Sequence, residues 1–259
     1  MKKYTRKEKC NMKALITGAS SGIGRDIARE LSKNGYDLIL VARNIEKLNE
    51  VKSELKTNVE VVSMDISNVE NCKKLHEKYK NISILVNNAG FGDCGYFTKT
   101  SLEKELQMIN TNIVAYHVLT KLYLQDMKEE NSGKILNVAS IVGFMPGPLM
   151  ATYYSTKAYV VRLSESIREE LRREKSKVQI SILCPGPVDT NFNKVADVEF
   201  ALKGLSSKYV AKYAVKKMFK GKFYIVPGIK IKLAKFASKI SETSIVAMVS
   251  YNMQRRKIQ

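Results

Sequence analysis

The chain has 259 residues, 44% of them hydrophobic and 27% charged, a composition that argues against a disordered or membrane-spanning protein. The length fits one large α/β domain. The formal net charge of +19 is concentrated at the ends, with six Lys/Arg and one Glu in residues 1–13 and fourteen Lys/Arg and one Glu in residues 203–259. Such ends favour an anionic partner, for example a lipid surface, an acidic carrier protein or a charged substrate, but a basic surface that is merely solvated is an equal alternative.

The cysteines and the N-terminus bear on where the chain works. No CxxC pair occurs, and no histidine completes a metal-binding spacing, so we expect no metal and reduced thiols in a cytoplasmic protein. The charged N-terminus lacks the apolar core of a signal peptide, and no segment has the length and apolarity to cross a bilayer. Residues 1–11 are expected to form a flexible basic extension.

Strand-like runs alternate with amphipathic helical stretches along most of the chain. Strands separated by helices indicate βαβ units, and right-handed crossovers then give a parallel sheet covered on both faces. We therefore expect an α/β fold with a doubly wound, parallel, seven-stranded Rossmann-type sheet in one domain over residues 12–228, followed by a basic amphipathic helical tail over residues 229–259. The predicted strands are 13–17, 37–42, 59–64, 82–87, 134–139, 178–184 and 223–226.

The first predicted strand runs directly into TGASSGIG, which opens a helix predicted over 23–33. Glycines allow a sharp turn and a close approach of the backbone to a pyrophosphate, whose charge is favoured at a helix N-terminus. By itself the pattern also fits a simple tight turn between a strand and a helix. The residues predicted to bind a dinucleotide here are Gly18, Ser20, Ser21, Gly22, Ile23 and Gly24.

The end of the second strand bears on which dinucleotide binds. An NAD site favours an acid at this point, whereas the 2′-phosphate of NADP favours a cation. The chain has Ala42 and then Arg43, which predicts NADP(H); in the alternative, Arg43 only pairs with Glu46 at the surface. At later strand ends, Asp65 and Ile66 are predicted near the adenine. Asn88, Ala89 and Gly90 are also predicted to contact the cofactor, whereas Asn87 is expected to bond the backbone first and a cofactor second.

Tyr153 and Lys157 lie four residues apart on a predicted helix and so share one face. A tyrosine loses its proton near pH ~10, and a nearby ammonium lowers that value, which suits acid/base work. Tyr154 points about a hundred degrees away on the same helix and is the weaker candidate. Ser140 ends the fifth strand, where its hydroxyl could hold a carbonyl, and Asn112 lies in a predicted helix. His76 and His117 are expected to be surface or helix-packing residues.

In chain order, TGxxxGxG, NNAG, a helix asparagine, a strand-end serine, YxxxK and PG together resemble the short-chain dehydrogenase/reductase family over residues 17–190. The resemblance implies that Tyr153 gives a proton to a carbonyl oxygen oriented by Ser140, while the nicotinamide supplies hydride. Lys157 would bind the ribose and depress the tyrosine pKa, and Asn112 would support a water. The positions expected along the nicotinamide are Pro185, Gly186, Val188 and Thr190.

The expected function is therefore NADP(H)-dependent interconversion of a carbonyl and an alcohol on a small-molecule substrate. A 3-oxoacyl thioester reductase is one alternative, although the DGG turn usual for the carrier-protein type is missing, and a non-catalytic NADP(H)-binding sensor is another. The resemblance also implies a homodimer or homotetramer packed through helices near residues 112–127 and 153–173.

Three segments are expected to line the substrate pocket, and the tail is expected to be helical. The segments 91–97, 141–150 and 191–205 are rich in apolar residues, among them Phe192, Val195 and Phe200, which favours a small apolar substrate unless these side chains pack on the core. In the tail, Ile229, Leu233, Phe236 and Ile240 form one stripe, with Lys232, Lys235 and Lys239 to one side and Lys230 apart. Such a helix can touch an anionic membrane, cover the active site or pack at a subunit interface. No aromatic stripe or groove-reading helix indicates nucleic-acid binding.

Overall fold

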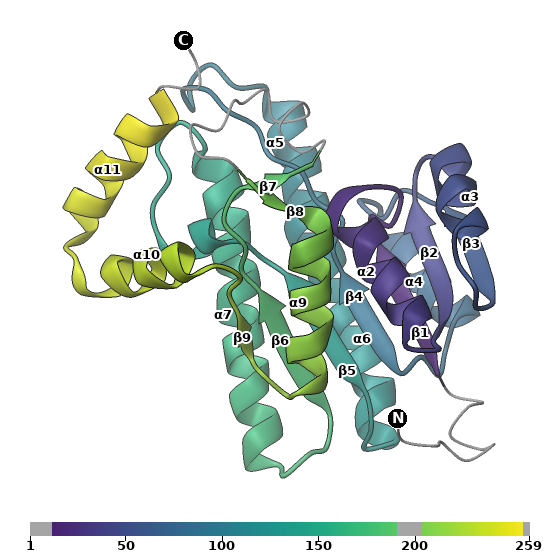
Figure 1. The fold of residues 1–259 in the computed structure, drawn as a ribbon. Helices are drawn as coiled ribbons and strands as arrows, with labels where there is room; N and C mark the ends of the chain where they lie inside the picture. The colour runs from purple at the N-terminus through teal and green to yellow at the C-terminus, as the bar shows by residue number, and fades with distance from the viewer. Residues whose placement is uncertain (1–11, 191–203, 256–259) are drawn as a thin grey trace.

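The computed structural model describes residues 12–190 and 204–255 (Figure 1). The predictions made for residues 1–11 and for most of the segment 191–205, including Phe192, Val195 and Phe200, lie outside the described residues.

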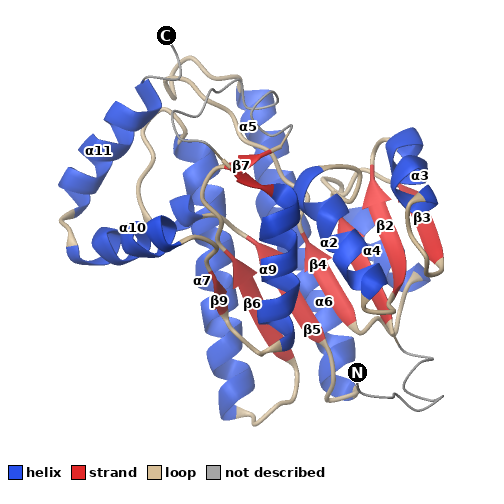
Figure 2. Ribbon diagram, viewed as in Figure 1, coloured by secondary structure: helices blue, strands red, loops and turns tan. Residues whose placement is uncertain are grey.

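Seven parallel strands form the central sheet, in the order β3-β2-β1-β4-β5-β6-β9 (Figure 2). Every predicted strand is present, and its ends differ from the prediction by at most two residues. The strands are β1 (Lys13–Thr17), β2 (Asp37–Ala42), β3 (Val59–Ser63), β4 (Ile84–Asn87), β5 (Lys134–Val138), β6 (Gln179–Leu183) and β9 (Tyr224–Ile225).

Helices cover both faces of this sheet, which confirms the doubly wound α/β fold. On one face lie α4 (Val69–Lys78), α6 (Ala115–Glu129) and α7 (Ala151–Arg173); on the other lie α2 (Gly22–Lys33), α3 (Ile45–Ser53) and α9 (Ser207–Phe219). Alternate strand residues pack into the two layers, because successive side chains of a strand point to opposite faces. In β1, for example, Leu15 joins one core cluster while Ala14 and Ile16 join the other.

The chain order reverses between β1 and β4, which lie side by side in the sheet. In open α/β sheets a ligand crevice forms at such a point, beyond the carboxyl ends of the strands. Helix α5 (Leu102–Ile109), a short 3-10 helix (Ile141–Phe144) and the small β7–β8 pair (Val188–Asp189 with Leu205–Ser206) follow strands at this end.

Asn112 lies in a helix, as predicted, but this helix is a π-helical segment, Asn110–Val114, that connects α5 to α6. Such π-helical turns are rare and often occur at functional sites, and no periodicity of apolar residues predicts them.

The tail consists of α10 (Ile229–Ile240) and α11 (Thr243–Arg255), which project from the body of the domain at the end where β7 and α5 lie (Figure 1). This confirms the predicted helical tail. None of the helices in the described ranges has the length and apolarity needed to span a membrane.

Candidate active site

A cavity of about 1350 Å³ lies beyond the carboxyl ends of the strands. The structure brings nearly all of the predicted site residues together around it; Gly24 and Asn112 lie behind its lining. The predicted residues that line the cavity are Gly18, Ser20, Ser21, Gly22, Ile23, Arg43, Asp65, Ile66, Asn88, Ala89, Gly90, Ser140, Tyr153, Lys157, Pro185, Gly186, Val188 and Thr190.

The turn after β1 requires glycine at two positions for different reasons. Gly18 has φ +65°, and a Cβ atom there would lie 2.7 Å from the Cα atom of Ala89. Gly24 has ordinary backbone angles, but a Cβ atom would lie 2.4 Å from both the Gly18 carbonyl oxygen and the Asn88 side chain. The backbone at the start of α2 thus passes close beneath the cavity, an arrangement that suits a pyrophosphate. The glycine turn and the N-terminus of α2 therefore fit the dinucleotide that the sequence predicts.

Asn88 connects this turn to the end of β4. Its side-chain amide donates hydrogen bonds to the backbone oxygens of Thr17 (3.0 Å) and Gly18 (3.1 Å). In return, the Thr17 hydroxyl accepts from the backbone N–H groups of Asn88 (3.0 Å) and Ala89 (3.2 Å). Two strand ends that are far apart in sequence are thereby held together, so Asn88 shapes the floor of the cavity.

Two cationic side chains line the cavity beyond β2, and only one of them, Arg43, was predicted from the sequence. Arg43 and Lys47 both line it, and the Asn44 side chain begins α3 by accepting a hydrogen bond from the Lys47 backbone N–H (2.7 Å). Within the described part of the chain no ion pair joins Arg43 to Glu46, so the surface-pair alternative has no support. The i, i+4 spacing from Arg43 was a signal that could have found Lys47.

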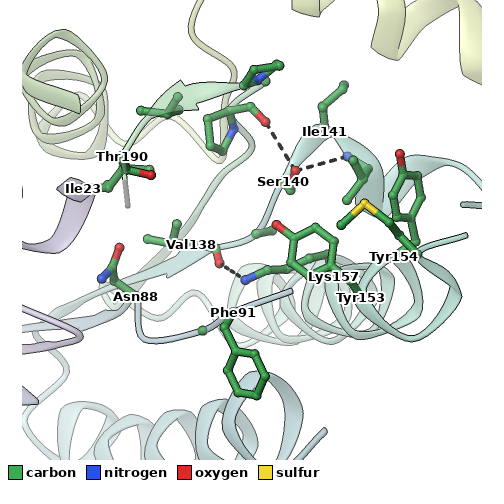
Figure 3. Close-up of a pocket in the computed structure, with 18 of the residues that line it drawn as sticks. Ile23, Asn88, Phe91, Val138, Ser140, Ile141, Tyr153, Tyr154, Lys157 and Thr190 are labelled. Carbon is green, nitrogen blue, oxygen red and sulfur yellow. Dashed lines mark hydrogen bonds between the residues drawn. The ribbon is translucent and has the colours of Figure 1, made fainter. Parts of the chain in front are cut away.

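Ser140, Tyr153 and Lys157 meet at the other side of the cavity (Figure 3). The Lys157 ammonium donates to the Val138 carbonyl oxygen (3.0 Å) and lies 5.9 Å from the centre of the Tyr153 ring. The Ser140 hydroxyl donates to the Pro185 carbonyl oxygen (3.4 Å) and accepts from the Val142 backbone N–H (3.3 Å). The turn after β5, which carries Ser140, and helix α7, which carries Tyr153 and Lys157, thus supply the cluster.

Burial determines the proton affinities in this cluster. It raises the pKa of Tyr153, which a hydrogen bond with Ser140 opposes, and it lowers the pKa of Lys157 to about 8. The ammonium was expected to lower the tyrosine pKa, but the net direction is the opposite. The physical reason is that both groups are withdrawn from water while the ammonium bonds the Val138 carbonyl. Tyr153 therefore carries its proton at neutral pH and can donate it.

Asn112 supports the cluster from behind. Its side chain is buried, accepts from the Phe91 backbone N–H (3.2 Å), and donates to the Phe91 carbonyl oxygen (2.9 Å) and the Thr156 hydroxyl (3.1 Å). A Cβ atom at Gly90 would lie 2.8 Å from the Asn112 side-chain oxygen and 3.4 Å from the Lys157 nitrogen. The NNAG segment, the π-helical segment and α7 therefore meet at one point. The water that the resemblance assigns to Asn112 stays a prediction.

The residues that the sequence analysis set aside have structural partners. Asn87 is buried and donates to the side chains of Thr120 (3.0 Å) and Asn137 (2.9 Å), so its contacts are structural as expected, although they join side chains and not the backbone. His76 bonds Asp126 (2.8 Å) and His117 bonds Tyr159 (2.8 Å), which confirms that both pack between helices.

The tail covers part of the cavity. Covering the active site was one of the three alternatives given for the tail, beside contact with a membrane and packing at a subunit interface. Ile231 of α10 packs over the PG turn so closely that a Cβ atom at Gly186 would lie 2.4 Å from its Cδ1 atom. In α11, Gln254 donates to the hydroxyl of Tyr154, so this tyrosine faces the tail. Sequence periodicity showed that the tail was amphipathic but carried no signal for its partner. The tail residues that line the cavity are Lys230, Ile231, Ala234, Ala237, Ser238, Ser241, Ile245, Val246, Val249, Ser250, Met253 and Gln254.

Comparisons with known proteins identify relatives of this chain. The family model for short chain dehydrogenases matches residues 12–199. An uncharacterized oxidoreductase of Staphylococcus epidermidis is 36% identical over 188 residues, which cover 71% of this chain and 81% of that protein. The human very-long-chain 3-oxoacyl-CoA reductase is 35% identical over 176 residues, which cover 64% of this chain and 56% of that protein.

Among solved structures, a short-chain dehydrogenase from Sphingobium yanoikuyae in complex with NADPH superimposes with a TM-score of 0.80 at 26% identity, covering 88% of this chain and 92% of that one. The chain therefore belongs to the short-chain dehydrogenase/reductase family of oxidoreductases.

Proposed function

We propose that this protein is an NADP(H)-dependent oxidoreductase that interconverts a carbonyl and a primary or secondary alcohol on an apolar substrate. One observation carries the proposal: Ser140, Tyr153 and Lys157 line the same cavity as the glycine turn at the start of α2. A protonated phenol and a dinucleotide cradle that share one cavity have the geometry that hydride and proton transfer to a carbonyl requires.

In the reducing direction, NADP(H) when bound would supply hydride to the carbonyl carbon. Tyr153 donates its proton to the carbonyl oxygen, and the Ser140 hydroxyl holds that oxygen by a hydrogen bond. Lys157 would hold the cofactor ribose through its buried ammonium and, at its lowered pKa, would take part in returning a proton to Tyr153. In the oxidising direction Tyr153 accepts the proton instead.

The preference for NADP(H) rests on the cations beyond β2. Arg43 and Lys47 line the cavity there, and Ala42 stands where an acid would favour NAD. The related Sphingobium yanoikuyae structure that contains NADPH supports this preference.

The apolar substrate is supported by the side chains between the catalytic cluster and the tail. Met145 and Met150 come from the segment before α7, and Ile231, Val249 and Met253 come from the tail. Their flexible or branched side chains form an apolar surface beside Tyr153, which favours a substrate that is apolar next to its carbonyl.

A 3-oxoacyl thioester is the second candidate substrate, because a protein named as a 3-oxoacyl-CoA reductase is 35% identical to this chain over 176 residues. The basic tail beside the cavity would also suit the phosphates of a thioester carrier.

NADPH oxidation, measured against apolar ketones, apolar aldehydes and 3-oxoacyl thioesters, tests the proposal. We expect turnover with NADPH that falls about 10³-fold in Tyr153→Phe, since general acid catalysis contributes about 10²–10⁴-fold. Cofactor binding, followed by nicotinamide fluorescence, should remain in this variant. Turnover that survives in Tyr153→Phe would refute the catalytic assignment, and NADPH binding without turnover on any substrate would favour the sensor alternative.

Oligomer formation is also proposed, through α6 and α7 as the family resemblance implies. Light scattering of the full chain distinguishes a homodimer or homotetramer from a monomer.

A further inference from the structure

The outward face of α10 carries an apolar stripe, whereas the opposite face of the tail contacts the domain. On α10, Ile229, Leu233, Phe236 and Ile240 are all more than 60% exposed. They follow the spacing i, i+4, i+7 and i+11 and so form one stripe. Such a contiguous exposed stripe is unusual on a protein that touches only water.

Contacts on the other faces hold α10 and α11 in place with the stripe outward. The Lys235 ammonium stacks 3.1 Å from the centre of the Tyr224 ring, and Ile231 packs on Gly186. On α11 the hydroxyl of Tyr251 bonds that of Tyr96 (3.2 Å), and Gln254 bonds Tyr154. The stripe therefore remains exposed while the opposite face of the tail is bonded to the domain.

Charge beside the stripe indicates what covers it. At 100° per residue, Lys232 and Lys239 flank the stripe on one side and Lys230 on the other, while Lys235 turns inward. Residues 203–241 contain no acidic residue. A second copy of this chain would bring the same positive charge to the contact, whereas an anionic lipid surface complements it.

Exposed side chains of the tail also line the cavity. Ile245, Val249 and Met253 of α11 line the cavity and yet are about half exposed, so they form an apolar rim at its mouth. On α10, Ala237 and Lys230 line the cavity and lie next to the stripe around the helix. Ile245, Val249 and Met253 of α11 and Ala237 of α10 thus bring apolar side chains of the tail to the lining of the cavity.

We propose that the α10–α11 helix pair docks on an anionic lipid surface through this stripe, with the mouth of the cavity turned toward the lipid. An apolar substrate dissolved in the bilayer then enters between the two helices without crossing water. Only this route of entry rests on the proposed function, since docking itself needs no turnover.

Co-sedimentation of the full-length protein with vesicles tests the docking. Vesicles of phosphatidylcholine alone are compared with equal mixtures of phosphatidylcholine and phosphatidylglycerol, at low salt and at about 0.5 M salt. We expect binding to the mixed vesicles that high salt weakens.

Two double variants, each with a matched control, locate the contact. Leu233→Glu with Phe236→Glu should reduce partitioning at least about a hundredfold, because each apolar side chain loses its burial. Leu102→Glu with Leu106→Glu on α5 is the control, since these side chains are 63% and 50% exposed and those of Leu233 and Phe236 are 64% and 63% exposed. Lys232→Glu with Lys239→Glu should reduce partitioning about thirtyfold or more at low salt. Lys74→Glu with Lys80→Glu changes the net charge equally at exposed positions near α4 and should have little effect.

The chain contains no tryptophan, so a single introduced tryptophan reports on its own surroundings. The emission of Met253→Trp at the mouth should shift to the blue on mixed vesicles, and that of Leu102→Trp should not. The proposal is overturned if the wild type binds neither kind of vesicle, if it binds both equally, or if the α5 control reduces binding as much as the stripe variant. It is also overturned if the stripe variant breaks an oligomer and vesicles bind nothing, which would identify a second copy as the occupant.

Discussion

The glycine turn after β1 and the α10–α11 pair line the same cavity but are built differently. The turn is fixed by backbone geometry, because atoms of Ala89 and Asn88 leave no room for a side chain at Gly18 or Gly24. The helix pair is held by a few side-chain contacts, such as those of Ile231 and Gln254. The proposed cofactor end of the cavity should therefore tolerate almost no change, whereas the substrate end can vary while the fold stays intact.

The largest effect is expected at the turn. Gly18→Ala places a methyl group 2.7 Å from the Ala89 backbone at φ +65°, so we expect a loss of about 3 kcal/mol or more in the free energy of unfolding and no measurable NADPH binding. Gly35→Ala is the matched control, because Gly35 has φ +85° but its nearest neighbour would be 4.0 Å away. It should cost only about 1 kcal/mol and keep NADPH binding. Chemical denaturation and NADPH titration measure both, and equal losses in the two variants would contradict the role of close packing.

Lys157 lines the same cavity as the two regions, and its burial has a consequence for stability. Its folded pKa of about 8 lies below the ordinary value of 10.5, so the unfolded chain binds the proton more tightly and stability rises with pH from about 8 to 10.5. Lys157→Met should therefore raise the free energy of unfolding by about 2–3 kcal/mol at pH 7 and by much less above pH 10, while removing activity. Denaturation at the two pH values checks this. A gain that does not depend on pH would show that the ammonium is not the cause.

A smaller effect is expected where the cofactor phosphate would bind. Arg43→Ala or Lys47→Ala should each raise the KM for NADPH about tenfold and leave the KM for NADH unchanged, because a charge-assisted hydrogen bond contributes about 1.5–3 kcal/mol. Lys52→Ala is the control, since Lys52 is exposed on the same helix and does not line the cavity. Steady-state kinetics with both cofactors measures the difference, and parallel losses with NADPH and NADH would argue against a 2′-phosphate contact.

The smallest effect is expected in the tail. Ile231→Ala should raise the KM for an apolar substrate about threefold to tenfold without changing NADPH binding, because it removes part of one half-buried apolar contact. Leu233→Ala on the same helix faces outward and should not change the KM for a substrate added in solution. If both variants changed this KM equally, α10 would not be acting as a wall of the cavity.

The sequence allowed prediction of the sheet and of most of the cavity lining. Apolar periodicity located all seven strands, and the order of strands and helices implied the parallel topology. Apolar periodicity could not locate the π-helical segment around Asn112, because a one-residue change of helical pitch leaves the pattern of apolar residues nearly unaltered. Lys47 lies four residues after Arg43, so the i, i+4 spacing could have identified it, but it was not among the predicted site residues.

Features that depend on local backbone chemistry were predictable from the sequence alone: the glycine turn at the start of α2, the alternation of strands with helices, and the placing of Tyr153 and Lys157 one turn apart on one helix. The groups that each of these residues contacts depend on the tertiary structure. The pKa directions of Tyr153 and Lys157 follow from burial by distant segments. The covering of the cavity by α10–α11 follows from contacts between residues such as Tyr154 and Gln254, a hundred positions apart in the chain. Proton affinity and shape complementarity depend on neighbours in space, and a pattern along the chain records only neighbours in sequence.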